Sequence, residues 1–246
     1  LHPLLIIARV QDEEQGNNDE ALAAYQRVLE IDSQNEQAIR ALEQLYIKRG
    51  AWDELRETYQ RKLELLDSDE ERKKIHFRLA SLYEEELEDA DQAIDAYRAV
   101  LDIDAGELRA LRALEGLFRG KERWSDLGEV LQQELSVADS ADVSNLVDLK
   151  FRLANLQEGH LDDLVGAIET YRSILDLQAG HEATRDALER HLAAEEIQVE
   201  VASILQPIYR ENRNWPKLIE AMEVGLKHQD DPLSRVERIL ELAQLW

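Results

Sequence analysis

The chain has 246 residues, and its 29 lysines and arginines stand against 53 aspartates and glutamates, giving a formal net charge of −24. Nucleic-acid binding needs clustered basic side chains that displace counterions from phosphates. The one basic cluster, Arg72-Lys73-Lys74, directly follows the acidic Asp69-Glu70-Glu71. No apolar run reaches the roughly 18 residues that span a membrane. The chain contains no cysteine, so disulfides and thiol chemistry are excluded.

Residue usage favours helix throughout. The chain holds only 10 glycines and 4 prolines, and it is rich in Ala, Leu, Glu, Arg and Gln, whose side chains lose little freedom in a helix. We expect the opening apolar residues 1–7 to form the core face of a first helix. The chain starts without Met and stops at Leu245-Trp246 inside an amphipathic pattern, as expected of a segment of a longer protein.

Internal repetition is the strongest signal. An alanine followed four residues later by a tyrosine recurs in the similar segments 19–32, 91–104 and 165–177. Their tyrosines are Tyr25, Tyr97 and Tyr171, so successive copies are 72 and 74 residues apart. Self-similarity at a fixed period is the mark of a repeat architecture.

A second kind of helix alternates with the tyrosine helices. It opens at Trp52, Trp124 and Trp215, and leucine follows three and eleven residues later in each copy. That spacing keeps one apolar stripe on a helix of 3.6 residues per turn. The repeating unit is therefore about 73 residues long and holds two helix-turn-helix hairpins of about 36 residues each.

Helix boundaries are readable from capping signals. A serine stands three residues before a glutamate at Ser33 and Ser68, which is capping-box spacing. Asp231-Pro232 pairs a cap with proline at the first helical position, and Gly50 and Gly120 stand where helices must end. These signals predict about fourteen helices of roughly 15 residues. Their short connections make neighbouring helices antiparallel.

The segments resemble tetratricopeptide repeats of the kind found in bacterial arrays. In that family the first helix of each hairpin carries a small residue late, matched here by Ala8, Ala80, Ala154 and Ala243. The second helix carries an alanine with an aromatic residue four positions later, matched by the Ala–Tyr pairs. The resemblance covers essentially the whole chain. It implies an all-α fold, a right-handed α–α superhelix or solenoid of antiparallel helices.

The regular spacing breaks once. The distance from tyrosine to the next tryptophan is 27 residues in the first two copies and 44 in the third. We expect one extra helix within His181–Glu196, with a stripe of Ala183, Leu188 and Leu192. The following helix, about 197–212, should kink near Gln206, because Pro207 removes a backbone donor and clashes with the preceding turn.

The predicted domain organisation follows from this break. A single solenoid spans 1–246, with about five regular hairpins over 1–179, an irregular part over 180–213 and a resumed, truncated repeat over 214–246. The irregular part is either a packing defect or a bend that shapes a binding surface.

The sequence predicts no catalysis. None of the six histidines has metal-ligand spacing, and the glycines belong to no phosphate-binding loop. We expect a protein that is not an enzyme, with no catalytic residues, no bound metal and no cofactor.

The resemblance also indicates where a partner would bind. In the family, the first helices of the hairpins line a concave groove, and ligand-facing positions lie three before, one after and four after the small residue. The equivalent positions here, with Tyr209 placed by the tryptophan alignment, are Ile39, Glu43, Tyr46, Phe77, Ser81, Leu111, Glu115, Phe118, Phe151, Asn155 and Tyr209. Each apolar member could instead be core.

The expected function is a protein-interaction scaffold that holds a peptide or helical segment of a partner in this groove. An apolar groove fringed by acids suits a basic-apolar segment. Two alternatives are a structural spacer or self-association module that pairs through open solenoid ends, and a helical repeat of the RNA-processing type. No nucleic-acid partner and no membrane insertion are expected, and a soluble cytoplasmic or periplasmic setting would fit equally.

One prediction concerns acidic tails. A tetratricopeptide subtype clamps an acidic C-terminus with Lys, Asn and Arg on its first helices, but the equivalent places in the second copy hold Phe77, Ser81 and Glu84. We therefore expect no binding of a peptide with an acidic C-terminus. Calorimetric titration tests this, and measurable affinity would show that another cationic group does the clamping.

Overall fold

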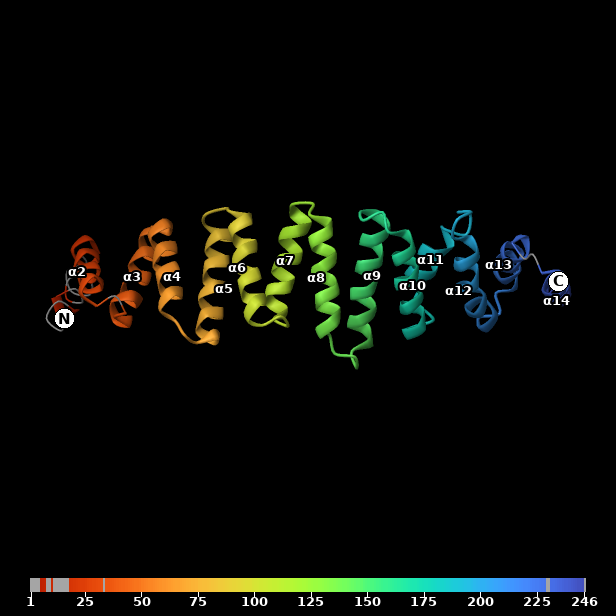
Figure 1. The fold of residues 1–246 in the computed structure, drawn as a ribbon, viewed down its shortest axis with the longest axis horizontal. Coiled ribbons are helices and arrows are strands. Elements are labelled where there is room, and N and C mark those ends of the chain that lie inside the picture. The colour runs from red at the N-terminus through yellow and green to blue at the C-terminus, as the bar shows by residue number, and fades with distance from the viewer. Residues whose placement is uncertain (1–4, 8–9, 11–17, 33, 229–230, 246) are drawn as a thin grey trace. The chain divides into compact units, whose positions relative to one another are not determined.

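A computed structural model describes the chain except for residues 1–4, 8–9, 11–17, 33, 229–230 and 246 (Figure 1). The described part contains thirteen α-helices and no β-strand, which confirms the all-α class. None of these helices combines the length and the apolar character needed to cross a membrane. The helices are α2 (Asn18–Ile31), α3 (Glu36–Arg49), α4 (Trp52–Leu65), α5 (Asp69–Glu85), α6 (Ala90–Ile103), α7 (Leu108–Gly120), α8 (Trp124–Val137), α9 (Val143–Gly159), α10 (Leu164–Leu177), α11 (Glu182–Glu189), α12 (Gln198–Glu211), α13 (Trp215–Lys227) and α14 (Pro232–Leu245).

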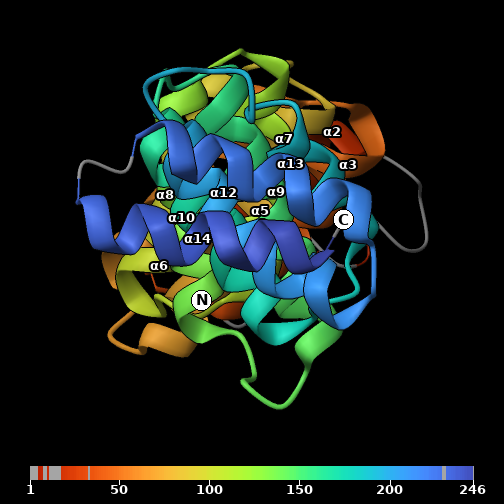
Figure 2. The ribbon, with the colours of Figure 1, turned by 90° about the vertical axis from the view of Figure 1, so that its right-hand side faces the viewer.

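The chain divides into two compact units, Leu1–Leu117 and Phe118–Trp246. In the first unit, α2 packs against α3, α3 against α4, α4 against α5 and α5 against α6. In the second unit, each helix from α8 to α13 packs against the next helix in the chain. Consecutive helices run in opposite directions within each unit (Figure 1). At the C-terminal end, α14 lies in front of α13, its packing neighbour (Figure 2). Each helix is therefore held mainly by its sequence neighbours.

Alanines lie at the tightest points of this packing. Five alanines of the repeat are fully buried, namely Ala21, Ala93 and Ala167 of the tyrosine helices and Ala80 and Ala154 of the preceding helices. Ala243 of α14, predicted at the same position, is exposed instead. A methyl side chain lets two helix axes approach closely, because interaxial distance depends on the side chains at the contact. Of the predicted small residues, Ala8 lies outside the described residues.

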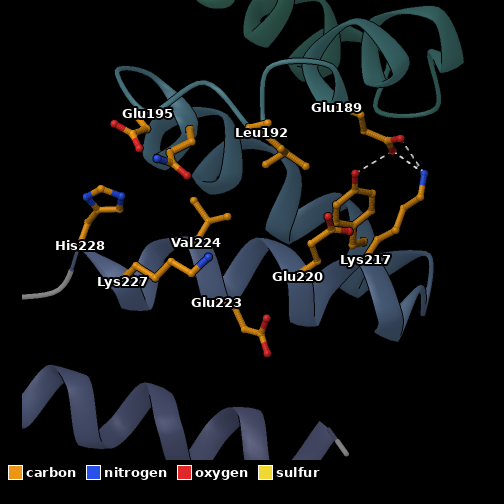
Figure 3. Close-up of a pocket in the computed structure, with 12 residues that line it drawn as sticks. Glu189, Leu192, Glu195, Lys217, Glu220, Glu223, Val224, Lys227 and His228 are labelled. Carbon is orange, nitrogen blue, oxygen red and sulfur yellow. Dashed lines mark hydrogen bonds and ion pairs between the residues drawn. The ribbon is translucent and has the colours of Figure 1, made fainter.

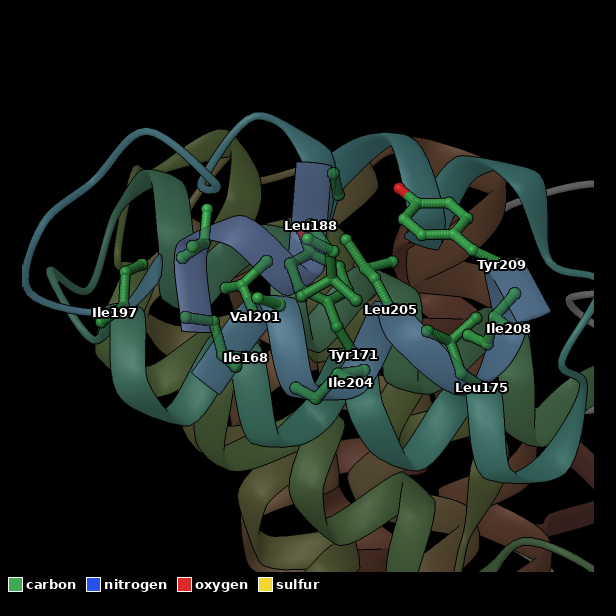
Figure 4. Close-up of a cluster of buried hydrophobic side chains, with 14 of the residues drawn as sticks. Ile168, Tyr171, Leu175, Leu188, Ile197, Val201, Ile204, Leu205, Ile208 and Tyr209 are labelled. Carbon is green, nitrogen blue, oxygen red and sulfur yellow. The ribbon is translucent and has the colours of Figure 1, made fainter. Parts of the chain in front are cut away.

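One cluster of buried side chains in the second unit extends from α9 to α14. Ile168 and Tyr171 from α10 meet Leu188 from α11 and the apolar face of α12, including Val201 and Leu205 (Figure 4). Burying side chains of this size contributes about 1.5–3 kcal/mol each before conformational entropy is counted. This cluster extends across the break in the repeat, so the break does not interrupt the core.

Side chains cap six of the described helix starts. The Ser68 hydroxyl accepts from the Glu71 N–H, as the capping-box spacing predicts, and Asp231 accepts from the Ser234 N–H at the start of α14. Ser33 lies outside the described residues. At the start of α3 the cap is Asn35, whose side chain accepts from the Ala38 N–H at 3.1 Å. The N-terminal apolar segment is described only in part, with residues 5–7 helical.

A left-handed residue recurs in the five hairpin turns between α3 and α13 that the structure describes. The turn between α3 and α4 uses Gly50, with φ of 66°. The other four hairpins place non-glycine residues there, at φ between 51° and 55°: Glu88, Glu122, Asp162 and Arg213. Gly120 ends α7 as predicted, yet the left-handed residue of that turn is Glu122. In all five turns the next N–H donates back to the first helix, as from Ala51 to the Tyr46 carbonyl at 2.9 Å.

The irregular part differs in detail from the prediction. The extra helix α11 has only eight residues, and turns occupy residues 190–197. Leu188 is buried as expected, but Ala183 is exposed and Leu192 lies beyond the helix, so the predicted stripe is wrong at these two positions. Thr184 and Ala187 are buried instead, because the helix turns that face toward its neighbours. Helix α12 continues through Pro207.

The left-handed turns predict a matched pair of stability changes. Gly50→Ala should lower the free energy of unfolding by about 1 kcal/mol, because a side chain at positive φ is strained. An added Cβ there meets only ordinary contacts with the Trp52 ring, the nearest atom at 3.8 Å. Glu88→Gly in the same unit should leave stability unchanged or raise it by up to about 1 kcal/mol. Urea unfolding followed by circular dichroism measures both, and equal losses in the two variants would contradict the explanation.

Candidate functional site

The structure buries most of the groove candidates. Ile39, Tyr46 and Tyr209 are buried, and Leu111 and Phe118 are 0% and 1% exposed. These five side chains belong to the core. Among the apolar candidates only Phe77 on α5 and Phe151 on α9 are partly exposed, and the polar candidates Ser81 and Asn155 follow them at the surface. The accessible candidates therefore lie on α5 in the first unit and on α9 in the second.

The acidic candidates are buried as well. Glu43 is 4% exposed and Glu115 is 7% exposed. The carboxylate of Glu43 joins three helices, since it accepts from Lys62 of α4 at 3.0 Å and from Arg78 of α5 at 3.1 Å. A buried carboxylate is tolerated when ion pairs and hydrogen bonds compensate its lost hydration. Glu43 thus fixes the packing of α3, α4 and α5.

A surface hollow lies beside Phe77 in the first unit, and we call it the α5 hollow. It encloses about 400 Å³ and is lined by Leu55, Tyr59, Lys74, Phe77, Arg78, Ser81, Leu82, Glu85, Glu86 and Arg109. The Phe77 ring is held in place by the edge of Tyr97, with ring centroids 6.1 Å apart, and by the guanidinium of Arg109, 4.7 Å from the ring centroid. The exposed part of Phe77 is therefore a rigid apolar wall.

A second hollow adjoins the α5 hollow. It encloses about 340 Å³ between α3, α4 and α5, and Ile39 and Ile75 are among its lining residues. Lys74 and Arg78 line both hollows. The two hollows therefore adjoin each other along α5, with lining residues from Glu71 to Glu86.

The hydroxyl groups of the repeat tyrosines tie the helices of each hairpin together. Tyr97 donates to Glu84 at 3.0 Å. Burial, together with this carboxylate, raises the pKa of Tyr97 to about 12. Tyr171 donates to Glu158 at 2.7 Å and to Asn155 at 3.0 Å. Asn155, a groove candidate, is thus committed to Tyr171 through its side-chain oxygen.

Phe151 occupies the place of Phe77 in the second unit, but its surroundings differ. Its ring centroid lies 6.1 Å from that of Tyr171 and 5.4 Å from that of His181. The ring of His181 thus stands against Phe151, in contrast to the guanidinium of Arg109 beside Phe77. The two phenylalanines therefore form a natural pair for comparison.

The break in the spacing arises because one helix of the repeat is present twice. Thr184, Leu188 and Glu189 of α11 stand at the repeat positions of Ala38, Leu42 and Glu43 in α3, counted from the preceding tyrosine.

A second comparison starts from the tryptophan that follows. Val201, Leu205 and Gln206 of α12 lie at the same distances before Trp215 as Ala38, Leu42 and Glu43 lie before Trp52. Helices α11 and α12 are therefore two copies of one helix, seventeen residues apart. The first copy stops after Glu189.

The truncated copy leaves the largest hollow described here, which we call the break pocket. It encloses about 820 Å³. The turn segment after α11 forms one side with Leu192 and Glu195, and α13 forms the other with Lys217, Glu220, Val224 and Lys227 (Figure 3). Glu189, Ala193, Gln198, Tyr209, Glu223 and His228 complete the lining.

Glu189 stands at one end of this pocket and joins its two sides. It accepts from the Tyr209 hydroxyl at 2.7 Å and from the Lys217 ammonium at 2.7 Å (Figure 3). Burial opposes ionisation of Glu189, but these two donors outweigh it and hold the pKa of the carboxyl below its usual value. Burial, and then the adjacent Glu189 carboxylate, raises the pKa of the Tyr209 hydroxyl.

Sequence reasoning placed Tyr209 among the candidates but missed Glu189, Lys217 and the pocket. The repeat register contained a signal for Glu189, since it is the third copy of Glu43 and Glu115. In α3, Glu43 and Tyr46 are three residues apart, whereas Glu189 and Tyr209 are twenty apart. The insertion separates Glu189 from Tyr209 in the sequence, but the fold places their side chains within hydrogen-bonding distance. No cluster of three or more potential metal ligands occurs among the residues that the structure describes.

Comparison with known families agrees with this repeat geometry. Three profiles of the tetratricopeptide repeat match residues 4–34, 38–73 and 74–107. The chain contains an array of tetratricopeptide repeats. These matches fall in the first unit, and the second unit carries the same Ala–Tyr and Trp signatures in register with them. Arrays of this family are protein-interaction scaffolds, and the chain is one by its architecture.

Solved structures of other repeat proteins are distantly similar. YrrB, described as a TPR protein with an unusual peptide-binding site, is 14% identical over 75% of this chain and 90% of its own, with a TM-score of 0.40. MamA is 18% identical over 74% of this chain and 97% of its own, with a TM-score of 0.42. A human IFIT1 dimer with PPP-AAAA is 17% identical over 93% of this chain and 54% of its own, with a TM-score of 0.45. No curated protein is significantly similar in sequence.

The hydrogen bond across the insertion gives a prediction for this tetratricopeptide-repeat array. Tyr209→Phe keeps the ring and removes a hydrogen bond to a carboxylate, so it should lower the free energy of unfolding by about 1.5–3 kcal/mol at pH 7. Tyr46→Phe is the matched control, since Tyr46 only accepts from the neutral Gln26 amide at 3.0 Å, and it should cost about 0.5–1.5 kcal/mol.

The pH dependence of the Tyr209→Phe cost has a definite sign. Because the folded pKa of Glu189 is lowered, its stabilisation is present above the ordinary carboxyl pKa and is lost as pH falls through the folded value. Urea unfolding at pH 7 and pH 3 should show the cost shrinking at the lower pH. A cost that is independent of pH would mean that the hydroxyl acts without the ionised carboxylate.

Proposed function

We propose that this scaffold binds a peptide or helical segment of a partner protein along α5. The observation that carries the proposal is that Phe77, a partly exposed groove candidate, faces a hollow and is flanked by the Tyr97 ring and the Arg109 guanidinium. Rigid aromatic side chains at the edge of a pocket are typical binding hot spots, because they contribute contact area at little entropic cost. A large apolar side chain of the partner would seat against Phe77, Tyr59 and Leu55.

The two adjoining hollows along α5 support an extended contact. A segment anchored at Phe77 can continue past Lys74 and Arg78 into the adjoining hollow beside Ile39. The rim of the α5 hollow carries Lys74, Arg78 and Arg109 together with Glu85 and Glu86. Arg78 already pairs with Glu43. The rim charge is therefore mixed, and the apolar anchor rather than the sign of the charge would select the partner.

Self-association is the second candidate, favoured by one feature. Helix α14 exposes Leu233, Val236, Ile239 and Leu240, with Leu233 77% exposed. The same positions in α5 are Glu70, Lys73, His76 and Phe77, most of them polar. A molar mass of twice the monomer in light scattering, restored to the monomer by Leu233→Glu and Leu240→Glu, would support this alternative.

A matched pair of phenylalanine variants tests the α5 site. Partners captured from the source organism's lysate by the wild-type chain are identified by mass spectrometry, and their binding segments are then titrated against the variants. Phe77→Ala should weaken binding at least about tenfold, as expected for a hot-spot side chain. Phe151→Ala, at the same repeat position in the second unit, should change it by less than about twofold.

Circular dichroism of both variants provides the folding control. Equal weakening by Phe77→Ala and Phe151→Ala, with folding intact, would place the partner elsewhere. If Phe77→Ala unfolds the chain, Ser81→Arg fills the same hollow from the surface and should give the same loss.

A further inference from the structure

We infer that the break pocket is a second, independent binding site, and that it receives a positively charged segment of a partner protein. The pocket belongs to the second unit and shares no residue with the α5 hollow. It lies at the irregular part of the array, between the turn segment after α11 and helix α13.

The shape of the break pocket suits a ligand. Its volume of about 820 Å³ falls within the roughly 300–1,000 Å³ typical of ligand sites. Its walls are fixed by buried residues, since Val224 of α13 and Tyr209 of α12 belong to the hydrophobic core and Leu192 packs against that core. The bond between Glu189 and Lys217 also holds α11 and α13 in place. The pocket is thus built from rigid elements.

The net negative charge of the break pocket favours a positively charged ligand. Four carboxylates and two lysines line it, so its net charge is −2 while His228 is neutral. Glu189 and Lys217 neutralise each other. The remaining carboxylates, Glu195, Glu220 and Glu223, make no ion pair with any other described residue, and only Lys227 opposes them. A lysine or arginine entering the pocket would meet uncompensated negative charge.

The apolar lining completes the specificity. Leu192 and Val224 lie between the Glu195 side and the Glu220 side of the pocket (Figure 3). A segment that pairs a basic residue with an apolar neighbour would satisfy both, whereas an acidic segment would be repelled by like charge. The occupant is therefore a basic-apolar segment, bound by a few residues and not by the protein's overall charge.

The experiment must separate the pocket from the general attraction of a chain with a net charge of −24. The probe is a twelve-residue synthetic helix with arginine on one face and leucine on the other, compared with the same peptide carrying glutamate for arginine. Both are titrated into the full chain by calorimetry at about 0.15 M salt, where the Debye length of about 8 Å screens distant charges.

Two double variants of equal net charge give the decisive comparison. Glu195→Gln with Glu220→Gln removes two pocket carboxylates, and the dissociation constant of the arginine peptide should rise at least about tenfold. Glu169→Gln with Glu200→Gln removes two exposed carboxylates of the same unit outside the pocket, and the constant should change by less than about twofold. Phe77→Ala should also leave it unchanged, which separates this site from the α5 hollow.

Three results would overturn the inference. The arginine peptide does not bind the wild-type chain, or it binds no better than the glutamate peptide. The two double variants weaken binding equally, which would indicate non-specific attraction. Neither variant weakens it, which would place the peptide elsewhere. Circular dichroism should show wild-type helix content in both variants, because all four glutamates are exposed.

Discussion

The close approach of neighbouring helices at buried alanines is the constraint on which the rest of this structure depends. Where α6 packs on α5 and α10 packs on α9, the fully buried Ala93 and Ala167 place only a methyl group at the contact. Larger residues are then forced to the flanks of each contact, where Tyr97 and Tyr171 reach back to carboxylates of the helix before them. The aromatic residue four positions after the alanine is therefore a consequence of the alanine's position.

Because each helix is held by its sequence neighbours, a change of one helix need not disturb the others. The extra helix at the break, with α11 and α12 at the same repeat position, illustrates this locality. Leu188 and Leu205 take the same buried role in successive copies, and a single cluster of apolar side chains includes both. An insertion of this size in the middle of a domain with one central core would displace many long-range contacts. In a repeat array the cost is confined to the adjoining helices.

The sequence predicted the elements of the fold because they depend on local pattern. Apolar periodicity, the Ala–Tyr pairs and the tryptophan positions place the described helices, and Ser68 and Asp231 mark two of their starts correctly. The extra helix was placed correctly but its length and inner face were not, since Ala183 and Thr184 are one residue apart and only tertiary packing decides which of them is buried. The same limit explains why Gly120 looked like the turn residue while Glu122 holds the left-handed conformation.

The candidate surfaces were less predictable than the fold. Phe77 and Phe118 are both large, apolar and placed at ligand-facing offsets, and nothing local to either reveals that one borders a hollow while the other is buried. Glu43 looked like the fringe of a groove, yet its burial depends on Lys62 and Arg78, which lie 19 and 35 residues away. The break pocket was hidden for a different reason. It is formed by a helix that stops early, and an absent turn of helix leaves no residue pattern to find.

The hydrogen bond between Glu189 and Tyr209 connects the two parts of the array at the point where the repeat spacing changes. One helix is added at this point, while the repeat spacing on either side of it stays regular. Here the order before Glu189 is counted from the tyrosines and the order after Gln198 is counted from the tryptophans, and this one pair of side chains fastens the two registers together. The same insertion is also where the break pocket lies. A repeat array can thus gain a new kind of surface without altering any of its regular layers.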